Sequence, residues 1–309
     1  MILALAGGVG GARLASGLAS CREPDQLALV VNTGDDFRLY GLHIAPDLDS
    51  VMYALAGCND AERGWGLRGE SWQCMRALEQ LGAGAWFQLG DKDLATHLLR
   101  TQSLNGGASL TKATHGLCQA YGVRHGILPM SDQPAPTWVD TDMGRLPFQE
   151  YFVREQCRPR VAGVQYSGGP PSAAFVQSLQ NPALDAIVIC PSNPYLSIGP
   201  IIALDGVRSA LKQRAVPAVA VSPIVGGASI KGPLAKIMGE LEVPVSPVSV
   251  ARYYAGLIDG LVIDQKDRRY RPEIEDLGIK TCVTDTVMLD AEARGMLARQ
   301  VLDFAGTLN

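Results

Sequence analysis

The first thirteen residues, MILALAGGVGGAR, constrain the fold more than any other stretch of the chain. The short apolar run Ile2–Ala6 is followed by Gly7, Gly8, Gly10 and Gly11, and then by an amphipathic helical pattern. A unit of strand, glycine turn and helix lets the backbone bend tightly and presents unpaired helix N–H groups to an anion. The pattern predicts a phosphate-bearing ligand, although a tight turn without a ligand also explains it.

The glycine pattern departs from the dinucleotide-binding fingerprint G-x-G-x-x-G at its last position. Gly8-Val9-Gly10 is followed by Arg13, where the fingerprint has its third glycine. A nicotinamide-dependent oxidoreductase needs close packing between helix and strand at this place. The sequence also offers no clear catalytic His or Lys for such an enzyme. An oxidoreductase is therefore the disfavoured alternative, and a lack of NAD binding would remove it.

Short apolar strands alternate with helical stretches along the chain. The strand candidates are residues 2–6, 27–32, 86–89, 126–129, 186–190, 218–222, 243–247, 261–264 and 281–284. The helical stretches include residues 94–101, 111–120, 201–213, 234–240 and 291–304. This alternation predicts an α/β fold with a mainly parallel sheet covered on both faces. Ligands of such sheets bind beyond the carboxyl ends of the strands, where the polar clusters of this chain also lie.

One section of the chain departs from this alternation of strands and helices. In residues 137–153, TWVDTDMGRLPFQEYFV, apolar and polar side chains alternate around Asp142-Met143-Gly144, which is typical of a hairpin. A stretch rich in proline and glycine follows at residues 167–172. We therefore expect one α/β domain over residues 1–309, with an inserted hairpin-containing subdomain at approximately 130–170.

The composition excludes several classes of protein. The net charge is −4 with no run of Lys or Arg, which argues against a nucleic-acid partner. Apolar runs are interrupted before they reach membrane-spanning length, and the N-terminus has no basic leader region. The seven cysteines show no C-x-x-C spacing, so they indicate reduced thiols rather than a zinc site or a disulfide framework. A cytoplasmic protein without a membrane partner is expected.

Two acidic clusters follow the first two strands. They are Asn32-Thr33-Gly34-Asp35-Asp36 and Pro46-Asp47-Leu48-Asp49-Ser50. Carboxylates beside a polyphosphate are the hard oxygen ligands that Mg²⁺ prefers, whereas turn formation and helix capping explain each residue singly. We predict that Asp36 and Asp49 bind Mg²⁺ and act in catalysis, with ligand and base roles not separated. Asp35 is expected to matter less, because adjacent side chains at a strand end point apart.

Two polar loops after later strands are suited to a nucleotide. The first runs from Cys190 through Pro194 to Gly199 and offers Ser and Asn groups for a base or sugar edge. The second runs from Ser222 to Lys231 and offers N–H groups and an ammonium to a diphosphate. A structural turn explains the first loop about as well. The predicted nucleotide- and phosphate-binding residues are Gly8, Gly10, Gly11, Arg13, Ser192, Asn193, Ser197, Gly199, Ser222 and Lys231.

Taken together and in this order, the clusters resemble the 2-phospho-L-lactate transferase family of deazaflavin coenzyme biosynthesis. The matching stretches span nearly the whole chain: LAGGVGGAR, NTGDD, PDLDS, WFQLGDKDLATHLLRT, LPMSD, RLPFQEYFV, CPSNPYLSIGP, SPIVGGASIKGP and the late DTVM. The resemblance implies a Rossmann-like three-layer fold with an inserted small subdomain, and a homodimer. It also implies a Mg²⁺-dependent transfer of a phosphorylated small acid from a guanosine-diphosphate-linked donor to the ribityl hydroxyl of the deazaflavin Fo (7,8-didemethyl-8-hydroxy-5-deazariboflavin), releasing GMP.

The resemblance leaves two questions open. It does not tell whether phospholactate, phosphoenolpyruvate or phosphoglycerate is transferred. A nucleotide-sugar-binding regulatory protein of the same fold, without catalysis, is the alternative, and binding of a deazaflavin would discriminate between the two. The residues expected at the deazaflavin are Thr33, Asp35, Gly90, Asp91 and Thr101.

Overall fold

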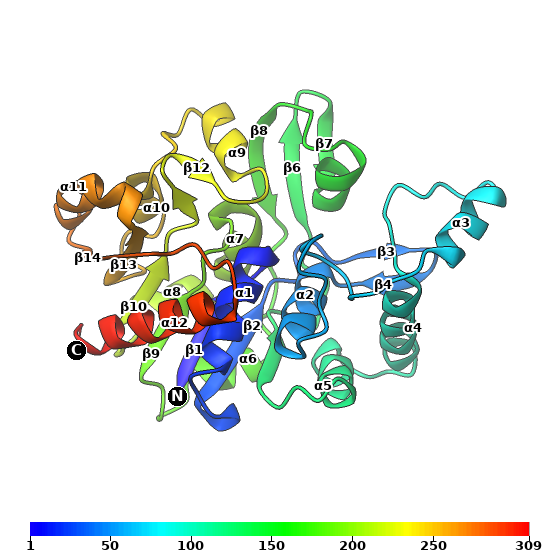
Figure 1. Cartoon of the computed structure of the whole chain (residues 1–309), viewed down its shortest axis with the longest axis horizontal. Helices are drawn as coiled ribbons and strands as arrows, with labels where there is room; N and C mark the ends of the chain where they lie inside the picture. Colours follow the sequence, from blue (N-terminus) through cyan, green and yellow to red (C-terminus); the bar gives the residue numbers. More distant parts are fainter. Residues whose placement is uncertain (309) are drawn as a thin grey trace.

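A seven-stranded parallel sheet forms the centre of the computed structural model, which describes residues 1–308 (Figure 1). Its strands follow the order β14-β13-β10-β9-β1-β2-β5, and every neighbouring pair is parallel. They are β1 (Ile2–Ala6), β2 (Leu27–Val31), β5 (Gly126–Pro129), β9 (Ala186–Ile189), β10 (Ala218–Val221), β13 (Gly260–Asp264) and β14 (Lys280–Thr284). The predicted α/β class with a mainly parallel sheet is therefore confirmed.

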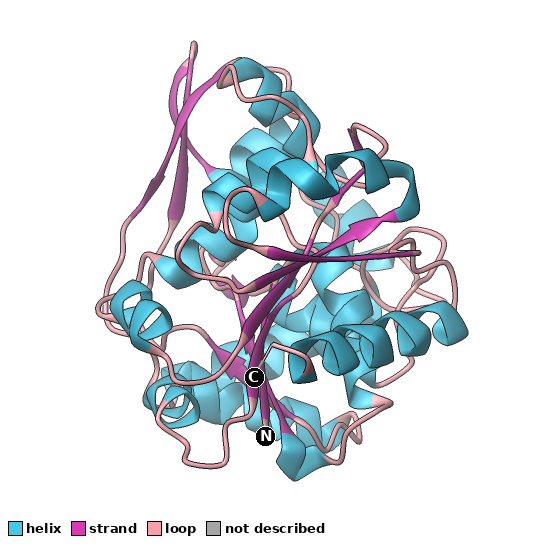
Figure 2. Cartoon of the chain, turned by 90° about the vertical axis from the view of Figure 1, so that its left-hand side faces the viewer, coloured by secondary structure: helices cyan, strands magenta, loops and turns pink. Residues whose placement is uncertain are grey.

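Helices cover both faces of this sheet and make three layers (Figure 2). One face carries α1 (Gly8–Ala19), α2 (Pro46–Leu55), α5 (Leu110–Ala120) and α12 (Ala291–Gly306). The other carries α6 (Ala173–Leu179), α7 (Gly199–Ile202), α8 (Val207–Gln213), α9 (Leu234–Glu240), α10 (Pro247–Tyr253) and α11 (Arg271–Glu275). Further helices are α3 (Gln73–Gln80), α4 (Asp91–Asn105) and the short η1 (Pro24–Gln26), η2 (Glu150–Arg154), η3 (Pro194–Ile198) and η4 (Gln265–Tyr270).

The central strands divide their side chains between two hydrophobic cores. In β1, Ala4 packs into the core beneath α1 and α12, whereas Leu3 and Leu5 pack into the core on the opposite face. Successive residues of a strand point to opposite faces, so an apolar run buried on both sides suits a central parallel strand. The run ILALA is apolar throughout because both faces of β1 are covered.

The connections reverse direction between β1 and β9. From β1 the chain builds outward through β2 and β5, and from β9 it builds the other way through β10, β13 and β14. Such a reversal opens a crevice beyond the carboxyl ends of the two strands. The glycine turn after β1 and the loop after β9 therefore meet at this place.

Three small antiparallel sheets complete the fold. The predicted hairpin is confirmed as β6 (Thr137–Thr141) and β7 (Gly144–Pro147), to which β8 (Val161–Tyr166) adds a third strand. The proposed limits of about 130 and 170 for an inserted subdomain stay a prediction. The other two sheets are β3 (Phe37–Leu39) with β4 (Leu42–Ile44), and β11 (Ile224–Val225) with β12 (Ala228–Ser229).

Three of the predicted elements were wrong in detail. Residues 86–89 form a loop, in which the rings of Trp86 and Phe87 pack against Phe37 instead of pairing in a sheet. Residues 243–247 lead into α10, because proline has no N–H for a ladder and suits the first turn of a helix. The stretch 201–213 is broken into α7 and α8, where Gly206 takes a left-handed φ of 74°.

Within residues 1–308, no helix combines the length and the apolar character needed to cross a membrane.

Candidate active site

A cavity of about 680 Å³ opens at the carboxyl edge of the central sheet. Its wall combines the start of α1, the two acidic clusters, an aromatic segment, the loop after β9 and the segment from Ser222 to Leu234. These parts come from sequence positions far apart, and the parallel sheet brings them to one edge. The crevice expected beyond the carboxyl ends of β1 and β9 is therefore present, and it is large enough for a small-molecule ligand.

The glycine turn sits at the floor of this cavity. Gly7 and Gly8 line it, and the N–H of Gly8 donates to Oδ1 of Asp47 at 2.7 Å. A side chain at Gly7 would bring its Cβ within 2.6 Å of the Asp47 carboxylate, and Gly8 has a left-handed φ of 63°. Both positions thus require glycine, and the N-terminus of α1, where an anion is favoured, faces the cavity.

Gly10 and Gly11 let the loop after β9 pack closely against the first turn of α1. A Cβ on Gly10 would lie 2.3 Å from the carbonyl oxygen of Pro191, and a Cβ on Gly11 would lie 2.5 Å from the hydroxyl of Ser192. The loop after β9 therefore packs directly onto the first turn of α1. Gly10 lines the cavity, whereas Gly11 is not among its lining residues.

Asn32 joins the two acidic clusters. Its side-chain amide nitrogen donates to Asp35 at 2.9 Å and to Asp47 at 3.0 Å, and all three side chains are buried. Gln149, from the segment after β7, donates to the other oxygen of Asp35 at 3.2 Å. Both carboxylates line the cavity. Within residues 1–308 neither of them forms a salt bridge, so this wall holds two carboxylates without a cation.

The surroundings disfavour the ionised forms of Asp35 and Asp47 and raise the pKa of both. Burial, followed by the charges of Asp47 and Asp36, holds the pKa of Asp35 well above its usual value. Burial raises the pKa of Asp47 to about 6, against the hydrogen bonds from Asn32 and Gly8, which lower it. A cation placed between the two would favour the ionised form of both.

Asp36 and Asp49, the predicted metal and catalytic residues, have partners within the protein. Asp36 lies 3.0 Å from Nε2 of His43 and is not among the cavity-lining residues. Burial raises the pKa of Asp36, and the hydrogen bond and charge of His43 oppose that rise. Asp49 lines the cavity but pairs with the buried Arg100 through both carboxylate oxygens.

Arg100 belongs to a buried polar network between α2 and α4. Nδ1 of His97 lies 3.2 Å from Nη1 of Arg100, and Nε2 of His97 lies 3.4 Å from the carboxylate of Asp93. Asp93 in turn accepts a hydrogen bond from the Tyr53 hydroxyl at 2.6 Å. Ligand atoms of Asp49, Asp93 and His97 lie within 4.8 Å of one another, the arrangement of a possible metal site. Arg100 already supplies a positive charge to this cluster.

The loop after β9 presents several of the predicted nucleotide residues. Ser192, Asn193 and Ser197 line the cavity, and Ser192 also accepts a hydrogen bond from the N–H of Gly7 at 3.1 Å. The side-chain oxygen of Asn193 caps η3 by accepting from the N–H groups of its second and third residues. Gly199 does not line the cavity; it packs closely against Tyr166, whose hydroxyl would lie 2.2 Å from an added Cβ.

The segment after β10 closes the opposite wall. Ser222 and Lys231 both line the cavity. The ammonium of Lys231 lies beside Gly64, where an added Cβ would approach it to 2.3 Å. Gly64 belongs to the loop after α2, so two loops from opposite parts of the chain meet across the cavity.

Aromatic side chains form one further wall, which we call the aromatic wall: Trp86, Phe87, Phe148 and Phe152. The rings of Phe148 and Phe152 stack with centroids 5.4 Å apart, and the guanidinium of Arg154 lies 4.6 Å from the ring centroid of Trp86. A flat aromatic ligand would find stacking partners here.

The other predicted acceptor residues lie outside the cavity lining. Asp91 accepts hydrogen bonds from the N–H groups that begin α3, and Thr101 accepts one from the N–H of His43 at 2.8 Å. A Cβ on Gly90 would collide with the side chain of Glu70. Thr33 is buried, and its hydroxyl has no partner among the described residues.

Several site residues were not singled out from the sequence. Asn32 and Asp47 lie inside the two acidic clusters that the sequence indicated. The hydrogen bond between their side chains depends on how the chain folds between the two clusters. Asp93, His97 and Arg100 follow the i, i+4, i+7 spacing of one helical face. This polar stripe in DKDLATHLLRT is the signal that could have predicted a buried network.

The sequence also matches a known protein family. Residues 2–302 match the family described as "2-phospho-L-lactate transferase CofD". The chain is 39% identical to a protein named phosphoenolpyruvate transferase from Streptomyces griseus, covering 98% of each chain. It is 37% identical to a protein named 2-phospho-L-lactate transferase from Methanosarcina acetivorans, covering 99% of this chain and all of the other.

A solved structure of a UPF0052 family member from Bacillus halodurans is similar in fold. Its TM-score is 0.62 at 15% identity, over 97% of this chain and 98% of that one. At this identity the likeness concerns the fold alone.

Proposed function

Because the chain belongs to the 2-phospho-L-lactate transferase CofD family, we propose that it transfers a phosphorylated small acid from a guanosine-diphosphate-linked donor to the ribityl hydroxyl of the deazaflavin Fo. The observation that carries this proposal is the cavity itself. It joins an anion-binding helix start, a pair of uncompensated carboxylates and the aromatic wall within one space.

The donor is assigned to the junction of β1 and β9. The start of α1 would receive the diphosphate, since first-turn N–H groups of a helix have no partner in a preceding turn. Ser192, Asn193 and Ser197, which line the cavity beside this helix start, would face the guanosine. The likeness to transferases at 37–39% identity over nearly the full chain favours this reading over a regulatory protein that only binds a nucleotide.

The carboxylate pair fits a divalent cation. Asp35 and Asp47 are both buried, both have raised pKa values, and share one amide donor rather than a cation. Hard oxygen ligands of this kind suit Mg²⁺, which would neutralise the diphosphate and draw charge from the phosphorus under attack. We propose Asp35 and Asp47 as its ligands. The sequence-based choice of Asp36 and Asp49 stays a prediction, to be compared with this pair.

The acceptor is assigned to the aromatic wall. The deazaflavin ring system is flat and apolar on its faces, so stacking against Trp86 or Phe152 would orient it with its ribityl chain toward the helix start. Of the residues predicted for the acceptor, Asp35 lines the cavity and accepts a hydrogen bond from Gln149, the neighbour of Phe148 in the chain, so it would contact the ribityl end.

The reaction forms one P–O bond and breaks one P–O bond and one O–H bond. The oxygen of the terminal ribityl hydroxyl attacks the outer phosphorus and loses its proton to the solvent. The bond from that phosphorus to the bridging oxygen breaks, and GMP leaves with the bridging oxygen. Such a displacement depends on positioning and on charge neutralisation more than on covalent catalysis. The chain contributes by fixing the diphosphate at α1, holding the acceptor on the aromatic wall and covering both with the loops that meet at Gly64 and Lys231.

Mass spectrometry of the product tests this function. The purified protein is offered Fo with each guanylylated acid in turn, those of phospholactate, phosphoenolpyruvate and phosphoglycerate, in the presence of Mg²⁺. The expected result is the mass of Fo plus one phosphorylated acid, together with an equal amount of GMP. If the protein binds the nucleotide but releases no GMP with any donor, it is the regulatory protein instead.

A further inference from the structure

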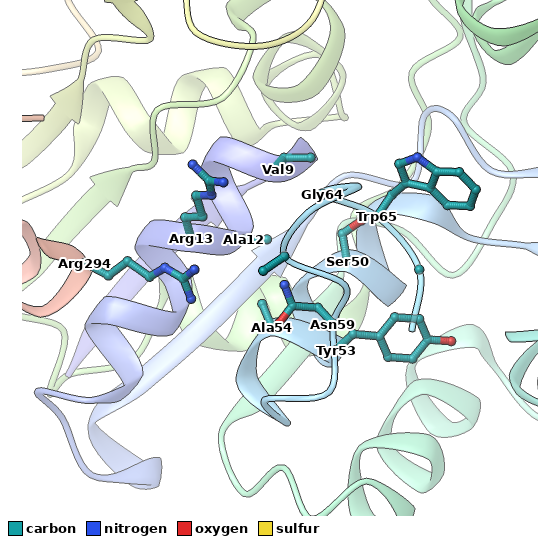
Figure 3. Close-up of a pocket in the computed structure, with 12 residues that line it drawn as sticks. Val9, Ala12, Arg13, Ser50, Tyr53, Ala54, Asn59, Gly64, Trp65 and Arg294 are labelled. Atoms are coloured by element: carbon teal, nitrogen blue, oxygen red, sulfur yellow. The ribbon is translucent and has the colours of Figure 1, made fainter. Parts of the chain in front are cut away.

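A small recess opens off the large cavity between α1, α2 and the loop after α2 (Figure 3). We call it the side pocket. It shares Val9, Arg13, Ser50, Tyr53 and the stretch 64–66 with the cavity, so the two spaces adjoin. Its remaining wall includes Arg294, which reaches in from α12.

The side pocket is positively charged. Two arginines line it and no Asp or Glu does. Within residues 1–308, neither Arg13 nor Arg294 forms a salt bridge. Arg13 donates to the carbonyl oxygen of Met288 at 3.1 Å, and the buried Nε of Arg294 has no partner. Half-buried guanidinium groups without a carboxylate leave hydrogen-bonding capacity and charge that an anion would satisfy.

The two cations also act on each other. Burial, and after it the charge of Arg294, lower the pKa of Arg13. An anion in the side pocket would relieve this repulsion and replace the water lost by burial. The neutral polar side chains of Asn59 and Ser50 line the same pocket and add donors for such an anion, whereas the Tyr53 hydroxyl already donates to Asp93.

The side pocket lies within reach of the start of α1. Arg13 follows Gly8 by five residues, a rise of about 7.5 Å along a helix. Helical side chains lean toward the N-terminus, so the guanidinium lies closer than its Cα does. Figure 3 shows the Arg13 side chain pointing toward the end of α1 at which Val9 lies. A small molecule with one anionic group at the helix start can therefore place a second in the side pocket.

We propose that the side pocket holds the carboxylate of the transferred acid, with Arg13 and Arg294 as its recognition residues. The proposal rests on the proposed function, in which the outer phosphorus lies at the start of α1. A 2-phosphorylated carboxylic acid carries its carboxylate on the carbon next to the phosphate ester oxygen. The pocket thus selects donors by a free carboxylate and leaves the nucleotide to the loop after β9.

The discriminating variant is Arg294→Gln, because Arg294 lines the side pocket but not the large cavity. Calorimetry measures the affinity for GDP and for the guanylylated acid, and steady-state assays give KM for the donor. We expect unchanged GDP affinity and a donor KM that rises about ten- to a hundredfold, the scale of one lost charged hydrogen bond. Arg299→Gln, on the exposed side of the same helix, is the matched control and should change neither value.

A donor whose carboxylate is methylated tests the assignment from the ligand side. Wild-type protein should bind this ester as weakly as Arg294→Gln binds the free acid, and the variant should lose little more with the ester. Equal losses for GDP and donor in Arg294→Gln would place the arginine at the diphosphate and overturn the proposal. The proposal is also overturned if the ester binds wild-type protein as tightly as the free acid does. This second measurement does not depend on whether the variant folds. If wild-type protein turns over no guanylylated acid at all, the proposed function itself fails.

Discussion

Arg100 and Asp49 form a buried ion pair in which each terminal nitrogen of the guanidinium donates to one carboxylate oxygen. Arg100 is 1% exposed and Asp49 4% exposed. Removing one member of a buried pair leaves the other charge uncompensated, which costs about 3–5 kcal/mol. The pair therefore stabilises the wall between α2 and α4, whatever part Asp49 takes in the reaction.

This predicts a strong effect of either single substitution on folding. Asp49→Asn and Arg100→Met should each lower the free energy of unfolding by about 3–5 kcal/mol in urea titrations. The double variant should lose clearly less than the sum, since neither charge is left alone. The exposed pair Arg252 and Glu273 is the control, and its single substitutions should stay within about 1 kcal/mol. Additive losses in the double variant would contradict the coupling.

A second prediction concerns pH and Asp47. Its folded pKa of about 6 lies above the ordinary value of 3.8, so folding takes up a proton between these values. The contribution to stability is complete below pH 3.8 and is lost as the pH rises through 6. Without Mg²⁺, Asp47→Asn should therefore be more stable than wild-type protein at pH 8, by about 2–3 kcal/mol at most. The difference should disappear near pH 4.

Thermal melts of both proteins at pH 4, 6 and 8 measure this effect. Added Mg²⁺ should stabilise wild-type protein at pH 8 and leave Asp47→Asn nearly unchanged. Asp303→Asn, at an exposed carboxylate of α12 that forms no salt bridge within residues 1–308, is the control. If Asp47→Asn is the less stable protein at pH 8 without metal, the uncompensated-carboxylate account of this wall is wrong.

Turnover measurements compare the two candidate metal pairs. Asp35→Asn and Asp47→Asn should each cut Mg²⁺-dependent turnover at least about a hundredfold, the scale of one lost electrostatic contact in a transition state. They should also raise the Mg²⁺ concentration needed for half-maximal rate. Asp36→Asn and Asp49→Asn serve as the comparison. If only these two shift the Mg²⁺ requirement, the metal lies at the pair chosen from the sequence.

The sequence could place the acidic clusters, but the choice between the two carboxylate pairs depends on local geometry that it does not give. The acidic clusters were placed at the carboxyl edge correctly, because parallel strands end at a common edge. The choice between Asp35 and Asp36 used the alternation of side chains along a strand. The chain has already left β2 at Val31, so Asp35 sits in a turn that Asn32 holds, and strand alternation does not apply there.

The aromatic wall could not be foreseen for a related reason. Residues 86–89 show a strand-like pattern, but pairing depends on a neighbouring strand that the local sequence does not reveal. The central strands were found because an apolar run covered on both faces is a local signal. The pairing of Arg100 with Asp49 of α2 and the approach of Arg294 from α12 to the side pocket are set by packing between distant segments, which the spacing within one helix does not encode.

Asn193 allows the last prediction, because capping and ligand contact can be separated at this residue. Its side-chain oxygen accepts from the N–H groups of Tyr195 and Leu196, and the residue also lines the cavity. Asn193→Ala removes both roles, so we expect a loss of about 1 kcal/mol in stability. GDP affinity should fall by roughly ten- to a hundredfold, the cost of a buried polar edge left without its partner. Asn193→Asp keeps the accepting oxygen but removes the amide donor, so it should retain the stability and still lose GDP affinity. Urea unfolding and calorimetric titration with GDP measure the two effects on the same samples. Normal GDP affinity in both variants would place the guanosine at another part of the cavity.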